Sequence, residues 1–147
     1  MSARLPGTDV RLRRGRRRDL DGVYALLAGD EPRRARFDRR TLSDMAQDVY
    51  VAEAPGGEVV GVVAVAYLRS LRAGRFAAVL DTARAHAGPR EPLLDRLIAF
   101  AEERARRRGC RQVRAWVDPG DGALRAALLS RGWQLGDALE AALEIDR

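Results

Sequence analysis

The fold is decided by one continuous stretch, residues 92–117, which reads PLLDRLIAFAEERARRRGCRQVRAWV. Its apolar residues first recur at helical spacing, with Pro92 suited to the first helical position and Gly109 to the residue just beyond the end. The arginines before Gly109 complement the negative end of the helix dipole. In the last six residues apolar and polar side chains alternate, as in a strand. The stretch therefore predicts a long helix over 92–109 that leads into a strand at 112–117.

The segments before this helix predict a sheet. Residues 48–54 and 58–68 are rich in β-branched side chains, and Pro-Gly-Gly at 55–57 supplies the positive φ angles that a hairpin turn requires. A third run at 75–85 predicts the next strand. The run at 58–68 is apolar on both faces, which is typical of a central strand with helices on both sides of the sheet.

Shorter patterns complete the predicted order of elements. They are a strand from Val10, a helix from Leu20 with Asp19 as its N-cap, one or two short helices within 32–47, a helix at 121–131, a short strand at 133–135 and a final strand through 139–145. The fold class is therefore α/β (α+β), with a mixed, mostly antiparallel sheet and helices on both faces. We expect residues 1–9 to form a flexible N-terminus and residues 10–147 to form a single domain.

All 27 basic residues are arginines, and with 21 acidic residues they give a net charge of +6. The two signs are interspersed along the chain, so we interpret the excess as a contribution to solubility, and nucleic acid is not the expected partner. A polyanion-binding surface would instead require the arginines to gather on one face of the structure.

One cysteine and one histidine limit the chemistry. Cys110 cannot form an internal disulfide, and with His86 alone it offers no metal site and no nucleophile–base pair. We expect Cys110 to be a buried thiol that precedes a strand. The chain has no secretory leader and no long apolar run, so a cytoplasmic protein without a membrane partner is predicted.

From Val10 to the C-terminus, the order of elements resembles that of the GNAT (GCN5-related N-acetyltransferase) superfamily. The resemblance is carried by VRLRRGRRRDLDGVYALL near the N-terminus, by the stretch at 92–117, and by ALRAALLSRGW, which is similar to the family's Ala-x-x-Leu-Tyr-x-x-x-Gly-Phe. It implies an acetyltransferase fold in which the pantetheine of acetyl-CoA lies between two splayed strands. Here those are the strand that ends near Ala85 and the strand that begins near Arg111.

The resemblance also places the pyrophosphate of acetyl-CoA at a loop before the 92–109 helix. The family pattern there is Gln/Arg-x-x-Gly-x-Gly/Ala, and of the three positions aligned with it only Gly88 matches. Two prolines remove backbone N–H donors from this region, so Arg90 is the candidate to supply the positive charge, and the alternative for it is a solvated loop arginine. The predicted cofactor-binding residues are Ala83, Arg84, Ala85, Gly88 and Arg90.

The catalytic positions also depart from the family pattern. Leu128 stands where the family tyrosine often protonates the leaving thiolate. Asp81, a single carboxylate in an apolar strand, is the candidate general base, and the alternative is a structural or edge-facing charge. Tyr67 and Glu53 are the candidate substrate-binding residues, with packing as the alternative for Tyr67.

Three functions follow from these observations. The first is transfer of an acetyl group from acetyl-CoA to an unidentified small-molecule or peptide amine, by direct attack in a ternary complex. The second is a catalytically impaired GNAT-like domain that binds a ligand or a protein, since both chemistry-bearing motifs are altered. The third is a basic domain associated with nucleic acid. A homodimer is left open in each case.

Overall fold

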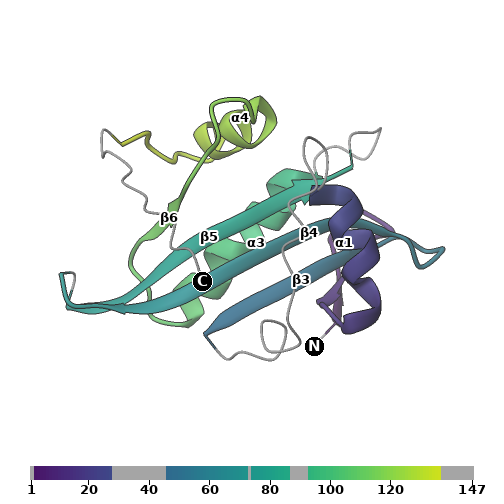
Figure 1. The fold of residues 1–147 in the computed structure, drawn as a ribbon, viewed down its shortest axis with the longest axis horizontal. Coiled ribbons are helices and arrows are strands. Elements are labelled where there is room, and N and C mark those ends of the chain that lie inside the picture. Colours follow the sequence, from purple (N-terminus) through teal and green to yellow (C-terminus); the bar gives the residue numbers. More distant parts are fainter. Residues whose placement is uncertain (1, 28–45, 73, 87–92, 137–147) are drawn as a thin grey trace, which may run out of the picture.

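The computed structural model describes residues 2–27, 46–72, 74–86 and 93–136. They form one six-stranded sheet in the order β1-β2-β3-β4-β5-β6, with α1 and α3 on opposite faces (Figure 1). The elements are β1 (Ser2–Arg4), β2 (Arg11–Arg14), the 3₁₀ helix η1 (Arg17–Asp19), α1 (Leu20–Leu27), β3 (Gln47–Glu53), β4 (Val59–Ser70), β5 (Arg75–Ala85), α3 (Leu93–Arg107), β6 (Val113–Ala115) and α4 (Gly122–Ser130).

The strand directions are those predicted from the sequence. Each of the first five strands is antiparallel to its neighbour, and β6 is parallel to β5, with Ala78 opposite Val113 and Leu80 opposite Ala115. Two parallel neighbours need a crossover connection, and α3 provides it. The prediction of a mixed, mostly antiparallel sheet is confirmed.

The core lies mainly between the sheet and α3. Leu97 and Ile98 of α3 are fully buried against the strands, and β4 accommodates the helix through a glycine. A Cβ atom on Gly61 would lie 3.0 Å from the Leu97 Cδ1 atom and 3.2 Å from the Ala52 Cβ atom. A larger residue at 61 would therefore push α3 away from the sheet.

A second, smaller core lies on the opposite face of the sheet. There Val23 and Leu26 of α1 are buried against valines of β3 and β4. The central strands are thus covered on both faces, which explains why β4 is apolar at nearly every position.

α3 ends as its sequence predicts. Gly109 has a φ of +77°, in the left-handed region that favours glycine. The Cys110 N–H then donates to the Ala105 carbonyl at 3.0 Å, which satisfies an acceptor of the last helical turn. This turn directs the chain into β6 beside β5.

Three expectations differ from the structure. The first residues were expected to be loose, but Ser2–Arg4 pair with β2 as an edge strand. Asp19 is not an N-cap: it ends η1, and its Oδ2 atom accepts the Arg16 N–H at 2.7 Å. Residues 133–136 form no regular secondary structure, so the short strand predicted there is absent.

Other predictions lie outside the described residues. These are the short helices within 32–47, apart from the start of β3, and the final strand through 139–145. Within the described part of the chain, no helix is both long enough and apolar enough to cross a membrane.

Candidate active site

The parallel pairing of β5 and β6 is short. Among the described residues, Ala78–Leu80 pair with Val113–Ala115, whereas β5 itself continues to Ala85. Both strands run in the same direction, and Figure 1 shows β6 leading away from β5 towards α4. We call residues 81–85, which lie beyond this pairing, the open edge of β5.

A β-bulge marks the point where the two strands separate. On β4, Val65 is the partner of Leu80 and Ala64 is the partner of Thr82, so Asp81 has no partner in this register. The extra residue of a bulge is left out of the ladder, and the bulged strand bends. Asp81 is exposed and lies one residue beyond the end of the pairing with β6. Its peptide group and its carboxylate therefore lie at the start of the open edge.

Three of the predicted cofactor-binding residues lie along this edge. Ala83, Arg84 and Ala85 pair with β4 on one side, and in the described residues no strand pairs with them on the other. Such an edge presents backbone donors and acceptors to an extended ligand, which can bind as an added strand. Gly88 and Arg90, the other two predicted residues, lie outside the described residues, just before α3 begins.

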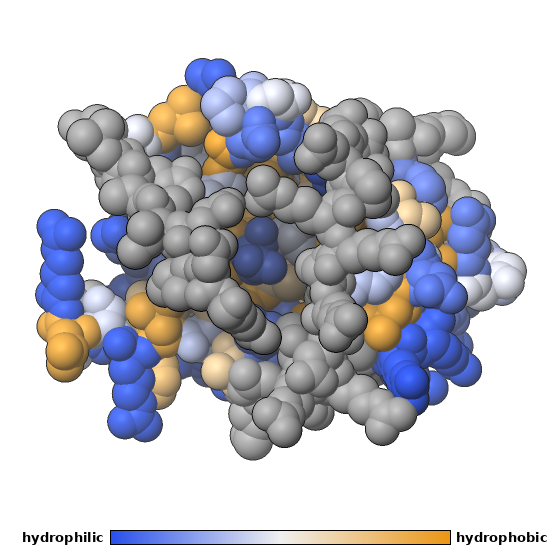
Figure 2. All heavy atoms as spheres, viewed as in Figure 1, coloured by the Kyte–Doolittle hydropathy of each residue, from blue (hydrophilic) through white to orange (hydrophobic). Residues whose placement is uncertain are grey.

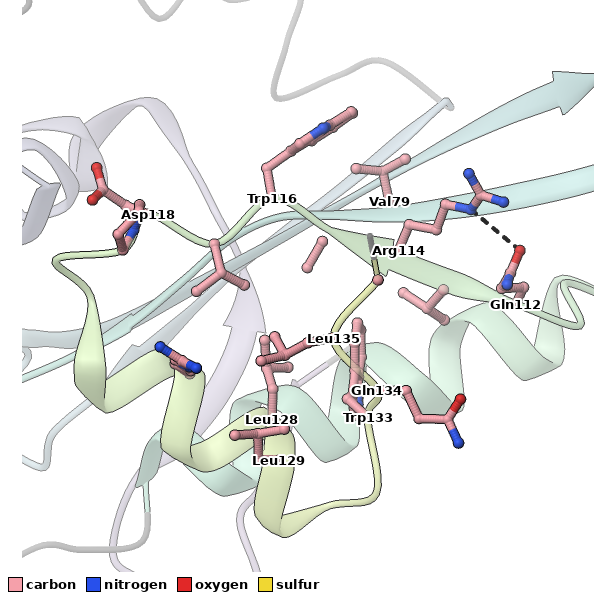
Figure 3. A pocket seen from close by; sticks show the side chains of 16 residues that line it. Val79, Gln112, Arg114, Trp116, Asp118, Leu128, Leu129, Trp133, Gln134 and Leu135 are labelled. Carbon is pink, nitrogen blue, oxygen red and sulfur yellow. Dashed lines mark hydrogen bonds between the residues drawn. The ribbon is translucent and has the colours of Figure 1, made fainter. Parts of the chain in front are cut away.

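Trp116 lies next to the point of separation and is 67 % exposed. A tryptophan next to a strand is expected in the core, and this expectation is wrong for Trp116. Figure 3 shows the indole on the side of β6 opposite to Leu128 and Leu129 of α4. The sequence of β6 indicates this exposure, because residues two apart lie on the same face of a strand. Trp116 is therefore on the face of Arg114 and not on that of the apolar Val113.

An open cavity of about 900 Å³ lies between β6, α4 and residues 133–136 (Figure 3). Leu128, at the position that the resemblance assigns to a tyrosine, is buried and lines this cavity together with Trp133. Val79 is the one residue of β5 that lines it. The cavity is therefore a different place from the open edge, which is formed by residues 81–85. Leu128 cannot supply the hydroxyl that a tyrosine would supply at this position.

Tyr67 does not reach the open edge. It is buried beneath the last turn of α3, where its hydroxyl donates to the Asp48 Oδ2 atom at 2.8 Å. Burial and the hydrogen bond to Asp48 both raise the pKa of Tyr67. The predicted part in substrate binding is therefore not supported, and its alternative, packing in the core, describes this residue.

Asp48 is the centre of a buried ion network, which we call the Asp48 network. Its side chain is fully buried, and the Arg104 Nε and Nη2 atoms lie 3.0 and 2.9 Å from Oδ2. Arg14 Nη2 and Arg108 Nη2 lie 3.3 and 3.6 Å from Oδ1. One carboxylate thus joins β2, β3, β4 and the C-terminal end of α3.

Glu53, the other predicted substrate-binding residue, belongs to a second network centred on Arg13. The Arg13 Nε and Nη2 atoms donate to Glu53 Oε2 at 2.7 and 2.5 Å, and the same guanidinium donates to both Asp19 oxygens at 2.7 and 2.8 Å. Burial raises the pKa of Asp19, but the hydrogen bonds from Arg13 and from the Arg16 N–H outweigh it and lower the pKa. Glu53 is therefore held in a network that joins β3 to β2 and η1.

A third set of contacts holds α4 onto α3. The Arg131 guanidinium donates to both Glu102 oxygens at 2.9 and 2.7 Å and to Asp95 at 3.1 Å. The Trp133 indole N–H donates to Glu102 Oε1 at 2.8 Å. These contacts fix the position of α4, and with it the direction in which the chain leaves β6.

Two other reactive side chains, Cys110 and His86, lie outside residues 81–85. Cys110 is buried as predicted, and burial raises the pKa of its thiol, which makes it unreactive. His86 is exposed beyond the end of β5, with its Nε2 atom 4.0 Å from Glu58 Oε1. No group of histidines, cysteines and carboxylates suited to a metal ion occurs among the described residues.

The solved structures that match this fold include acetyltransferases and a transcriptional regulator. A transcriptional regulator from Bacillus halodurans C-125 matches with a TM-score of 0.75 and 22 % identity, over 94 % of this chain and 99 % of that chain. A ribosomal-protein-alanine N-acetyltransferase from Brucella melitensis biovar Abortus 2308 matches with a TM-score of 0.73 and 21 % identity, over 92 % and 99 %. An aminoglycoside N-acetyltransferase in complex with CoA matches with a TM-score of 0.74 and 13 % identity, over 95 % and 98 %.

No protein-family model and no curated protein matches the sequence. The structural likenesses cover nearly the whole of each chain, so they establish the fold. The chain has the fold of the GNAT acetyltransferases, as its sequence predicts.

Proposed function

We propose that this chain is an N-acetyltransferase that transfers an acetyl group from acetyl-CoA to an amine by direct attack. The observation that carries the proposal is the open edge of β5, where β6 separates from β5 at the Asp81 bulge. This edge can pair with the amide groups of pantetheine, which is itself an extended chain of peptide-like units.

The positions along the edge suggest how the substrate is oriented. The start of α3 follows the open edge in the chain, and the first N–H groups of a helix favour a phosphate. With the phosphates at that end, the thioester lies towards the Asp81 bulge. A peptide N–H outside the ladder at the bulge is placed to donate to the carbonyl oxygen as it gains negative charge.

Asp81 is the proposed general base. The amine nitrogen forms a bond to the thioester carbon, the bond from that carbon to sulfur breaks, and the nitrogen gives up its proton to the Asp81 carboxylate directly or through a water. The CoA thiolate is then protonated from solvent, because Leu128 cannot donate a proton. An exposed carboxylate at the start of the edge suits this part better than the ion-paired Asp48 or Asp19.

The buried Leu128 favours a second candidate function. Without the family hydroxyl at this position, the chain could bind acetyl-CoA as a ligand and transfer nothing. In this alternative acetyl-CoA still binds at the open edge, but no acetyl group is transferred. No amine acceptor is then required.

Release of CoA thiol in the presence of a panel of amines tests the proposal. We expect turnover with at least one amine, and we expect Asp81→Asn to lower kcat by about 10²–10⁴-fold, the usual contribution of a positioned base. Glu103→Gln, which removes an exposed carboxylate on the far part of α3, should leave turnover unchanged. Cys110, the only thiol of the chain, is buried and gives a low background with thiol reagents.

Acetyl-CoA binding without turnover of any amine would support the ligand-binding alternative. If neither binding nor turnover is found, both functions fail. If Asp81→Asn turns over as fast as the wild type, Asp81 is not the base. That result would not contradict the binding of acetyl-CoA at the open edge.

A further inference from the structure

The β4–β5 hairpin exposes large apolar side chains at its tip. Leu71 is fully exposed, and Leu68 and Phe76 are 45 % and 44 % exposed. They lie on a part of the hairpin that extends past Tyr67, the residue covered by the Arg108 guanidinium at 4.5 Å. The hairpin tip therefore projects beyond the end of α3, as Figure 1 also shows. Exposed apolar residues grouped in this way mark an interaction site more often than isolated ones do.

Arginines alternate with these apolar residues. Arg69, Arg72 and Arg75 are exposed on the same hairpin, and the Arg69 guanidinium lies 5.3 Å from the centre of the Phe76 ring. No acidic residue occurs between Glu58 and Asp81 in the sequence. The tip thus combines an apolar surface with a local positive charge. Figure 2 shows hydrophilic and hydrophobic side chains standing side by side at the edge of the molecule where Figure 1 places this hairpin.

The charge continues onto the neighbouring end of α3. The Gln112 carbonyl accepts the Ala78 N–H at 3.4 Å, which brings Arg111 beside the base of the hairpin. Residues 103–112 contain five arginines and one carboxylate, Glu103. Beneath them, Asp48 is already shared among several guanidiniums. Part of the excess charge of +6 is therefore concentrated at one end, contrary to the even distribution inferred from the sequence.

We propose that this end of the molecule, the hairpin tip with residues 103–112, docks onto an anionic membrane surface. Arginines are attracted to the negative surface potential of anionic lipids, and leucine and phenylalanine side chains enter the boundary between headgroups and acyl chains. A projecting tip with apolar side chains reaches a flat surface without any change in the rest of the fold. Phosphate groups of the lipids supply the negative charge that the arginines complement.

Two other occupants fit the tip less well. A nucleic acid would bind the arginines and could stack on Phe76, but Leu68 and Leu71 would gain nothing from it, because they carry no donor and no flat ring. A second copy of the chain, docked tip to tip, would bring like charges together. The apolar residues therefore favour lipid over the first, and the arginines disfavour the second.

Co-sedimentation with vesicles tests the proposal on the full chain. We expect binding to vesicles of phosphatidylcholine mixed with phosphatidylglycerol, and little binding to phosphatidylcholine alone. Replacement of Arg69, Arg72 and Arg75 together by glutamine should weaken binding about 100-fold, because each arginine near an anionic surface contributes about five-fold. Leu71→Ser should weaken it about ten-fold, since one leucine side chain is no longer buried in the interface.

Matched variants elsewhere on the surface provide the controls. Replacement of Arg4, Arg17 and Arg18 by glutamine removes the same charge from exposed positions away from the hairpin, and Leu129→Ser removes an exposed leucine from α4. Both should bind vesicles at least ten-fold more tightly than the corresponding tip variants.

Three results would overturn the proposal. The first is an absence of binding to phosphatidylglycerol vesicles at low salt. The second is equal weakening by the tip and control arginine variants, which would indicate a general charge effect. The third is vesicle binding that Leu71→Ser leaves unchanged, together with binding to a labelled DNA duplex that requires Arg69, Arg72 and Arg75, which would identify the tip as a nucleic-acid surface.

Discussion

The two buried ion networks of the sheet have opposite compositions. In one, a single cation, Arg13, lies between the carboxylates of Asp19 and Glu53; in the other, a single anion, Asp48, lies among three arginines. The side chains of Arg13 and Asp19 are 8 % and 5 % exposed. The arginine partners of Asp48 are 22–48 % exposed.

The difference determines what happens when the central residue is lost. An arginine holds its charged group at the end of a long stem, so the partners of Asp48 can turn that group into water. The short side chain of Asp19 cannot do so and would remain buried without a partner. Removal of one member of a buried pair is most costly where the other stays desolvated. The network built on a buried cation should therefore be the more fragile.

The largest effect is expected from Arg13→Met. This change keeps the long apolar stem and leaves two adjacent carboxylates without a cation, so it should lower the free energy of unfolding by about 3–5 kcal/mol. Chemical denaturation measures the loss. Acid should partly relieve the defect, because protonation of Asp19 removes its repulsion with the neighbouring carboxylate. A loss of less than about 1 kcal/mol would contradict the account of this network.

The wild type should respond to acid in the opposite direction. The folded-state pKa of Asp19 is lowered, so its contribution to stability is present above the unfolded pKa of about 3.9. That contribution is lost as the pH falls through the lower folded pKa. The stability gap between wild type and Arg13→Met should therefore narrow below about pH 4. A gap that stays constant down to the pH of acid unfolding would argue against ion pairing as its cause.

A smaller loss is expected from Asp48→Asn. The asparagine retains an acceptor for the Tyr67 hydroxyl, and the arginines can rehydrate, so the cost should be about 1.5–3 kcal/mol, as for hydrogen bonds to a charged group. The same denaturation series measures this loss of unfolding free energy. Lowering the pH should not make the Asp48→Asn variant more stable. If Asp48→Asn proves more damaging than Arg13→Met, the explanation based on rehydration is wrong.

The smallest effect concerns Tyr67 at alkaline pH. Its folded-state pKa is raised, so its contribution is fully present below the unfolded pKa of about 10 and is lost as the pH rises towards the folded value. Stability should fall by up to about 1.4 kcal/mol for each pH unit above 10. Tyr67→Phe should show a shallower decline than the wild type, and an equally steep decline would contradict this account of Tyr67.

Local patterns predicted much of the fold. The limits of β5 are those expected from its apolar run, and α3 begins and ends within two residues of the predicted helix, because periodicity and end residues are properties of adjacent positions. The ion networks were not predicted. Arg104 is 56 residues from Asp48, and Arg13 is 40 residues from Glu53, so no local pattern connects them.

The candidate site was predicted in part for the same reason. Asp81 was identified as a single carboxylate in an apolar strand, but the bulge depends on the register with Ala64 and Val65, which the sequence of β5 does not contain. The partners of Tyr67 and Glu53, which are Asp48 and Arg13, lie on neighbouring strands, so the sequence around Tyr67 and Glu53 does not show them. Pairing across the sheet thus decided which polar residues are structural.

The binding of acetyl-CoA at the open edge of β5 is the central claim, and isothermal titration calorimetry tests it most directly when the bulge is removed. Deletion of Asp81 takes out the one residue without a partner on β4 and leaves every other pair in register, so the sheet should fold. It should also straighten β5 beside β6 and close the edge. We predict that the wild type binds acetyl-CoA in a 1:1 complex and that the deletion variant, with an unchanged circular dichroism spectrum, binds at least about ten-fold more weakly, a difference of about 1.4 kcal/mol. An absence of heat with the wild type at millimolar acetyl-CoA, or equal affinity in the folded deletion variant, would contradict the claim.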